Sequence, residues 1–197
     1  MRTSFVFLAE GFEDIEAITV IDVLRRAGMD VKTVSISSSL QVRSAHGNIL
    51  TADLIYDATH FTDPDWLILP GGMPGATNLY EFSPLAGLLR RQMESPSGHI
   101  AAICAAPAVV LGQLGLLQGR RATCYPGFEK LCAGAEMIDT PVVADEKMVL
   151  GNGPANALVW ALNIVKVACG VEAAEKVASG MLYFVRARKE DEMYDFG

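Results

Sequence analysis

The chain reads HIAAICAAPAVVL from His99 to Leu111, and this stretch decides the fold class because it joins two kinds of element. Residues 99–103 are short, apolar and uncharged, which predicts a buried strand. The residues after Cys104 are rich in alanine and then apolar, which predicts a helix. Pro107 is compatible with that helix if it lies in the first turn. Cys104 is therefore expected on a sharp turn between a strand and a helix.

A cysteine on such a turn has two interpretations. Its thiol can face the positive end of a helix dipole and free backbone N–H groups, which favour the reactive thiolate. Alternatively, Cys104 is a small buried hydrophobic residue, as most free cysteines are. The segment by itself leaves both interpretations open.

Strands and helices alternate along the rest of the chain. Strands are expected at residues 5–8, 30–36, 66–69 and 121–124, with the last beside the cysteine strand, and hairpins within 40–56 and 142–150. Helices are expected at residues 14–27, 75–80, 84–94, 154–168 and 171–185, the first with Ile15, Ile18, Ile21 and Leu24 on one face. Almost continuous apolar strands that alternate with helices predict an α/β fold. Its central sheet should be mostly parallel, with helices on both faces.

Length and composition limit the classes of protein to consider. A chain of 197 residues predicts one domain, here residues 1–185, followed by a polar C-terminal tail, 186–197. The net charge of −7 disfavours nucleic acid or an anionic membrane surface as partner. No apolar run reaches the roughly 20 residues of a membrane span, and the N-terminus does not resemble an export signal. We therefore expect a cytoplasmic protein.

Cysteine and histidine usage gives no sign of a disulfide framework or a metal site. The four cysteines form no CxxC pair, so reduced thiols are expected. The three histidines do not lie at ligand spacing from a cysteine, so no metal is expected.

Three sequence features end strands at the carboxyl edge of the predicted sheet. They are Glu10-Gly11-Phe12, Pro70-Gly71-Gly72 and Cys104. Ligand sites of such sheets lie at this edge. This coincidence favours the reactive interpretation of Cys104.

Four motifs occur together in a characteristic order. They are AEGFEDIE (9–16), LPGG (69–72), AAICAAP (101–107) and GNGP (151–154). With this set the chain resembles the ThiJ/PfpI superfamily, and within it the branch of the Parkinson's-associated protein deglycase. The resemblance covers nearly the whole chain. It implies a flavodoxin-like sandwich, a homodimer and no cofactor.

The resemblance also implies roles for individual residues. Cys104 matches the nucleophile, Glu16 the acidic residue beside its sulfur, and Gly72 and Ala105 the backbone N–H donors of an oxyanion hole. Burial beside a thiolate would push Glu16 towards its neutral form. Without the resemblance, Glu16 reads as an exposed first-turn carboxylate, and residues 70–72 read as a turn that ends a strand. The functional interpretation adds that Gly71, which has no side chain, lets a ligand approach the backbone.

Two positions depart from the pattern of the superfamily. Tyr125 stands where close relatives often carry a histidine, and a phenol is a poor base at neutral pH. Ala105 stands where protease-like members have a histidine, so a Cys–His peptidase would lack its base. His46 either faces the site across a dimer or is a solvated turn residue. Tyr125 is expected to line the pocket as a hydrogen-bonding group.

The resemblance implies a glyoxalase- or deglycase-type lyase or hydrolase that acts on α-oxoaldehydes such as methylglyoxal, or on their thiol and amine adducts. The alternative is a redox-sensing chaperone whose Cys104 is oxidised to a sulfinate.

Overall fold

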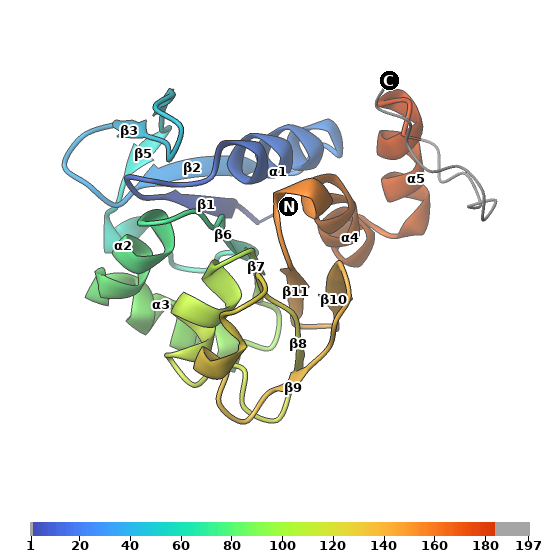
Figure 1. Ribbon diagram of the computed structural model, residues 1–197. Helices are drawn as coiled ribbons and strands as arrows, with labels where there is room; N and C mark the ends of the chain where they lie inside the picture. Colours follow the sequence, from blue (N-terminus) through green and yellow to red (C-terminus); the bar gives the residue numbers. More distant parts are fainter. Residues whose placement is uncertain (1, 184–197) are drawn as a thin grey trace, which may run out of the picture.

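One central sheet organises the chain in the computed structural model, which describes residues 2–183 (Figure 1). Its strand order is β10-β11-β7-β6-β1-β2-β5, and every pairing is parallel except β10 with β11. The strands are β1 (Ser4–Leu8), β2 (Val31–Ser35), β5 (Leu54–Ile55), β6 (Trp66–Leu69), β7 (His99–Ile103), β10 (Val142–Ala144) and β11 (Met148–Gly151). The predicted flavodoxin-like α/β fold is confirmed.

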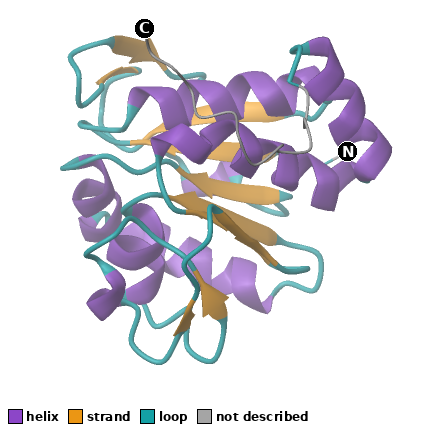
Figure 2. Cartoon of the chain, turned by 45° about the vertical axis from the view of Figure 1, so that its right-hand side comes forward, coloured by secondary structure: helices purple, strands orange, loops and turns teal. Residues whose placement is uncertain are grey.

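Helices cover both faces of this sheet (Figure 2). Side chains alternate along β1, so Val6 and Leu8 enter one core and Phe5 and Phe7 the other. On the first side lie α1 (Asp14–Arg26), α4 (Ala157–Cys169) and α5 (Val171–Gly180). On the second side lie α2 (Gly75–Glu81), α3 (Ser83–Glu94) and η2, the π-helix Pro107–Gly112. The buried strands thus pack on helices from both directions.

The apolar face of α1 differs from the prediction. Ile21 and Leu24 are buried, but Ile15 is 56% and Ile18 is 50% exposed. Isoleucines three residues apart drift around a helix that turns every 3.6 residues. The buried stripe instead follows the residues Glu16, Ala17, Val20, Val23 and Leu24.

The segment 121–124 does not lie beside the cysteine strand, so that prediction is wrong. β8 (Arg121–Ala122) pairs with β9 (Glu136–Met137) in a separate two-stranded sheet. The neighbours of β7 are β6 and β11. The fully buried β11 offers β7 a longer apolar ladder than the half-exposed β8 can.

The remaining elements match the predictions closely. β3 (Gln41–Arg43) and β4 (Ile49–Thr51) form the first predicted hairpin, and β10 with β11 the second. The predicted helix 154–168 begins as a short 3-10 turn, η4 (Pro154–Asn156), and α5 ends at Gly180. Two further 3-10 turns are η1 (Ala58–His60) and η3 (Glu129–Leu131). The predicted domain end at residue 185 and the tail 186–197 lie outside the described residues.

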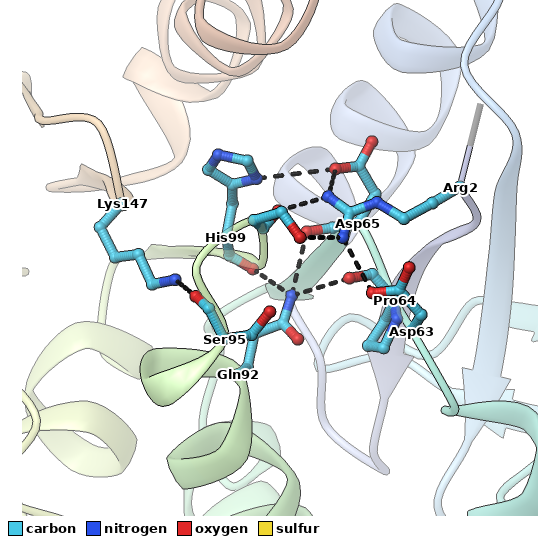
Figure 3. A network of polar contacts seen from close by, with 9 residues as sticks. Arg2, Asp63, Pro64, Asp65, Gln92, Ser95, His99 and Lys147 are labelled. Carbon is cyan, nitrogen blue, oxygen red and sulfur yellow. Dashed lines mark hydrogen bonds and ion pairs between the residues drawn. The ribbon is translucent and has the colours of Figure 1, made fainter.

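A polar network ties together the amino ends of the parallel strands (Figure 3). The Arg2 guanidinium contacts Asp63 and Asp65 at 2.9 Å each, and also donates to the Ser97 carbonyl. The buried Gln92 amide donates to the carbonyls of Pro64, Asp65 and His99, and the Lys147 ammonium donates to that of Ser95. These groups join chain segments at one edge of the sheet, which leaves the opposite, carboxyl edge for Cys104.

No helix in the described part of the chain combines the length and apolarity that a bilayer crossing requires.

Candidate active site around Cys104

Cys104 lies where β7 ends at the carboxyl edge of the sheet. Its backbone has φ = 63°, a left-handed conformation that side chains rarely adopt. Its N–H donates to the Gly151 carbonyl at 2.9 Å, and its carbonyl accepts from the Tyr125 N–H at 2.8 Å. The predicted sharp turn is thus present, and Pro107 begins the helix after it. Such strained backbone is often found at functional sites.

Glu16 reaches this turn from the first turn of α1. The side chain is fully buried, so the reading of an exposed first-turn carboxylate is wrong. Its Oε2 accepts the Gly71 N–H at 2.7 Å, and the Cys104 thiol lies within hydrogen-bonding reach of the carboxyl group. Its Oε1 is buried and has no nitrogen or oxygen partner among the described residues. The structure therefore brings together the two residues that the resemblance assigned to the chemistry.

Gly71 and Gly72 allow this close approach because they lack side chains. A Cβ on Gly71 would lie 2.7 Å from the Cys104 Cβ and 2.9 Å from the Glu16 Oε2. A Cβ on Gly72, whose φ is 89°, would lie 2.5 Å from the Glu13 nitrogen. The turn after β6 therefore needs glycine at both positions.

The charges of Glu16 and Cys104 depend on each other. Burial raises the pKa of the Glu16 carboxyl from 4.5 to about 7, although the Gly71 N–H and the Cys104 thiol oppose the shift. Burial and the Glu16 charge raise the pKa of the Cys104 thiol to about 12, and the Gly72 and Ala105 N–H groups only partly compensate. The predicted direction for Glu16 is confirmed. The backbone N–H groups favour the Cys104 thiolate as predicted, but burial and the Glu16 charge outweigh them. A negative charge on Glu16 therefore disfavours the Cys104 thiolate, so the thiol ionises more easily while Glu16 is neutral.

Tyr125 lies beside Cys104 through its backbone. Its side chain is 45% exposed, and its ring packs near Gly153 and edge-on to Phe128, with ring centroids 6.3 Å apart. Within residues 2–183 its hydroxyl has no hydrogen-bond partner, because Cys124 and not Tyr125 turns into the core. The phenol is thus exposed, and its place in the Cys104 pocket stays a prediction.

Comparison with known proteins agrees with this geometry. Residues 2–167 match the DJ-1/PfpI family. The chain belongs to this family. It is 37% identical over 177 residues to Protein DJ-1 homolog B of Arabidopsis thaliana, covering 89% of this chain and 40% of that protein. This DJ-1/PfpI chain therefore spans less than half the length of that relative. The predicted family resemblance is confirmed.

Two further relatives are matched over nearly their whole length. Deglycase PH1704 of Pyrococcus horikoshii is 32% identical over 161 residues, which cover 81% of this chain and 95% of that protein. The solved structure of oxidized Toxoplasma gondii DJ-1 superimposes with a TM-score of 0.88 at 36% identity, covering 93% of this chain and 99% of that one. The Toxoplasma gondii relative thus shares the flavodoxin-like fold of the DJ-1/PfpI chain.

The sequence of this DJ-1/PfpI chain gives no indication of one cluster of possible metal ligands that the structure contains. Ligand atoms of Glu13, Asp14 and His46 all lie within 4.8 Å of one another. Although burial opposes it, hydrogen bonds from Ser44, Asn48 and His46 hold the pKa of Asp14 at about 2. His46 Nδ1 lies 3.0 Å from Asp14, so a metal ion would have to displace this contact. Asp14 and His46 come from distant segments, so sequence spacing does not reveal the cluster.

The role of Gly151 was also missed. Its carbonyl accepts the Cys104 N–H and so helps to hold the strained turn. The only signal in the sequence is that Gly151 begins the fourth motif, GNGP.

Proposed function

We propose that this chain is a cofactor-independent glyoxalase- or deglycase-type enzyme of the cytoplasm. Its substrates would be α-oxoaldehydes such as methylglyoxal, or their adducts with thiols and amines. The proposal rests mainly on one observation: a buried carboxyl group, Glu16, lies against a thiol, Cys104, that also faces the N–H groups of Gly72 and Ala105. This arrangement supplies a nucleophile, a group that moves protons and donors for a developing negative charge.

In the proposed reaction, Glu16 takes the thiol proton and the Cys104 sulfur attacks the aldehyde carbon. The resulting alkoxide, stabilised by the backbone N–H donors, receives that proton and becomes a hemithioacetal. Glu16 then removes the hydrogen from this carbon as a proton, and an enediolate forms. The hydroxyl proton passes to the neighbouring oxygen and Glu16 returns its proton to the neighbouring carbon, which leaves a thioester of a hydroxy acid on Cys104. Water hydrolyses the thioester and releases lactate. The sum is one methylglyoxal plus one water to one lactate and one proton.

The exposure of the sulfur limits the size of the substrate. Cys104 is only 8% exposed, so a small aldehyde reaches its sulfur more easily than a folded protein does. The Pyrococcus relative carries the name deglycase, which supports the wider class of glycated thiols and amines as substrates.

A single assay tests the proposal. Purified protein treated with a chelator is incubated with methylglyoxal, and D-lactate and L-lactate are measured separately. We expect one enantiomer in excess, because a carbon protonated by one fixed group receives the proton on one face. Failure to form lactate above the buffer background would rule the proposed activity out.

A redox role is the second candidate, and the same donors favour it. The N–H groups of Gly72 and Ala105 and a protonated Glu16 can together hold the oxygens of a Cys104 sulfinate. The Toxoplasma gondii relative, whose structure is that of an oxidized DJ-1, supports this candidate. Intact mass after peroxide treatment, compared with lactate formation, separates this candidate from the enzymatic one.

Replacement of Tyr125 by phenylalanine tests whether the phenol orients the substrate. Loss of one neutral hydrogen bond should lower kcat/KM about 5-fold, which corresponds to about 1 kcal/mol. The matched control is Tyr80→Phe on α2, which should leave kcat/KM unchanged. Complete loss of turnover in Tyr125→Phe would instead make the phenol essential to the chemistry, and no change would place it outside the site.

We also propose that two copies of the chain form a homodimer through α1 and the β3–β4 hairpin. Ile15 and Ile18 expose one apolar strip of α1, and Ile49 of β4 is 54% exposed. The Asp14 carboxylate of α1 accepts a hydrogen bond at 2.6 Å from the Asn48 side chain, which lies in the turn between β3 and β4. This contact holds α1 and the hairpin together. Apolar side chains grouped in this way are typical of an interface.

The double variant Ile15→Asp, Ile18→Asp should be a monomer, because each new carboxylate would be buried without a partner. Light scattering coupled to size-exclusion chromatography measures the mass. The control is Val171→Asp, a similarly exposed residue on α5. A double variant with the dimeric mass of the wild type would place the interface elsewhere, and a monomeric wild type would rule out the homodimer.

A further inference from the structure

Glu13, the residue before α1, carries a buried side chain that has no part in the chemistry proposed for Cys104 and Glu16. It is 8% exposed, and its Oε2 caps the helix by accepting the Glu16 N–H at 2.8 Å. Shorter side chains, those of serine, threonine, aspartate and asparagine, usually provide such a cap. A charged group is costly to bury, so capping by itself does not account for a glutamate at this position.

Glu13 belongs to a closed ring of three hydrogen bonds with Gly71 and Glu16, here called the Glu13 ring. The Glu13 N–H donates to the Gly71 carbonyl at 3.0 Å, and the Gly71 N–H donates to the Glu16 Oε2 at 2.7 Å. The bond from the Glu16 N–H to the Glu13 carboxyl group completes the ring. Glu13 therefore holds both the backbone of Glu16 and the glycine to which the Glu16 side chain is bound.

The Glu13 ring packs directly on the Cys104 turn. An added Cβ on Gly71 would lie 2.7 Å from the Cys104 Cβ and 2.8 Å from the Ile103 carbonyl oxygen. Only the missing side chain of Gly71 lets the two segments meet so closely. A displacement of Gly71 would therefore move the Glu16 carboxyl relative to Cys104.

The Glu13 ring also sets the direction of the peptide group between Gly71 and Gly72. In a trans peptide the carbonyl and the N–H lie in one plane and point in opposite directions. Because the Gly71 carbonyl faces the Glu13 N–H, the Gly72 N–H points away from Glu13. Two successive glycines impose little steric restriction on this peptide group, so the bond from the Glu13 N–H is what fixes its direction.

We propose that Glu13 is a positioning residue, which fixes the Gly71–Gly72 peptide group and the Glu16 carboxyl where the reaction at Cys104 needs them. Glu13 acts through Gly71 and Glu16 and forms no bond to the substrate. Its service to the reaction rests on the function proposed above, whereas the ring is a feature of the fold. Without the ring, the Glu16 side chain and the Gly72 N–H are both free to turn away from the reacting atoms.

Three substitutions at this position remove the bonds of Glu13 step by step. Glu13→Gln keeps the N–H and a side-chain oxygen, so the ring stays closed. Glu13→Ala loses only the bond to the Glu16 N–H. Glu13→Pro also loses the bond to the Gly71 carbonyl, because proline has no N–H. The φ of Glu13 is −82°, near the angle that proline fixes, so the backbone can accept this substitution.

Nuclear magnetic resonance of isotope-labelled protein tests the ring without an assay of activity. A short bond to a carboxylate moves an amide proton downfield, so the Gly71 resonance reports its bond to Glu16. We expect the wild-type position in Glu13→Gln, an upfield shift in Glu13→Ala and a larger one in Glu13→Pro. The amide resonances of Val6 and Ile68, inside the sheet, should stay in place in all three variants. A merely structural role of Glu13 would lower stability but leave the Gly71 resonance of the folded protein where it is.

The kinetics of lactate formation provide the second readout. In Glu13→Pro, kcat should fall at least about 10-fold, because a misplaced oxyanion donor acts on the transition state. KM should change less than about 3-fold, since substrate binding does not use the ring. Glu13→Gln, the conservative variant, should restore both values.

The outcomes separate this proposal from the proposed activity. An unmoved Gly71 resonance in Glu13→Pro would overturn the positioning role, and if that variant does not fold, an unmoved resonance in Glu13→Ala would do so. A moved resonance together with wild-type kcat would also overturn it. If the wild type forms no lactate, the proposed activity is refuted, and the Gly71 resonance alone decides whether Glu13 holds the ring.

Discussion

Replacing Cys104 by alanine should abolish lactate formation from methylglyoxal, with a fall in kcat/KM of at least about 10³-fold. In the proposed reaction the sulfur is the protein atom that bonds to the substrate carbon. Without it no hemithioacetal forms on which Glu16 can act. Alanine keeps the two backbone hydrogen bonds of the turn, from Cys104 to Gly151 and from Tyr125 to Cys104. The variant should therefore fold, which circular dichroism and a thermal melt verify.

The matched control for this experiment is Cys169→Ala, at the end of α4 and only partly buried. It should change kcat/KM by less than about 2-fold, since it lies on a helix end away from the Cys104 turn. If Cys104→Ala kept more than about a tenth of wild-type activity, the reacting sulfur would not be Cys104.

Replacing Glu16 by glutamine should lower kcat/KM by about 10²- to 10⁴-fold, because the amide cannot accept and return a proton. The shape of the pH profile provides a second readout. In the wild type, activity should rise as pH increases through about 7, where the buried carboxyl becomes able to accept the thiol proton. In Glu16→Gln the remaining activity should lack this step. If the activity of Glu16→Gln still rose at the same pH, that rise would belong to the titration of another group.

The same substitution should change how stability depends on pH. The folded-state pKa of Glu16, about 7, is above its ordinary value of 4.5, so the folded protein holds this proton more tightly than the unfolded chain. The contribution of this group to the free energy of unfolding is fully present below pH 4.5. About 3 kcal/mol of it is lost as the pH rises to about 7. Glutamine is neutral at every pH, so the variant avoids this loss.

Chemical denaturation at about pH 5 and about pH 8 measures the effect. The free energy of unfolding of Glu16→Gln, relative to wild type, should increase by up to about 3 kcal/mol between the two conditions. Glu175→Gln, an exposed position on α5, is the control and should show no such increase. Equal pH dependence of Glu16→Gln and wild type would mean that Glu16 is not buried in its ionised form.

Local patterns in the sequence were sufficient for the architecture. The apolar runs at 66–69 and 99–103 become β6 and β7, and the glycines and prolines between elements end them near the expected residues. Such signals depend on a few neighbouring residues, so they survive without knowledge of the fold. For the same reason the residues around Cys104 are enough to place it on a strand-to-helix turn.

Local sequence patterns do not determine which strands pair with each other or which face of a helix packs on the sheet. Ile15 and Ile18 look like core residues but lie on the outer side of α1, because the angle at which a helix packs is set by the sheet beneath it. The strand at 121–122 pairs with β9, because a buried strand elsewhere in the chain, β11, competes better for β7. Both outcomes depend on contacts between distant segments.

The sequence by itself determined the α/β fold, the family and the residues that lie at the carboxyl edge of the sheet. Only the tertiary structure decided how Cys104 and Glu16 affect each other. Proximity to a helix end favours the thiolate, but burial together with a buried carboxyl raises the pKa of Cys104. Desolvation depends on everything that packs around a group, and a charge acts across space, so neither can be read from local sequence.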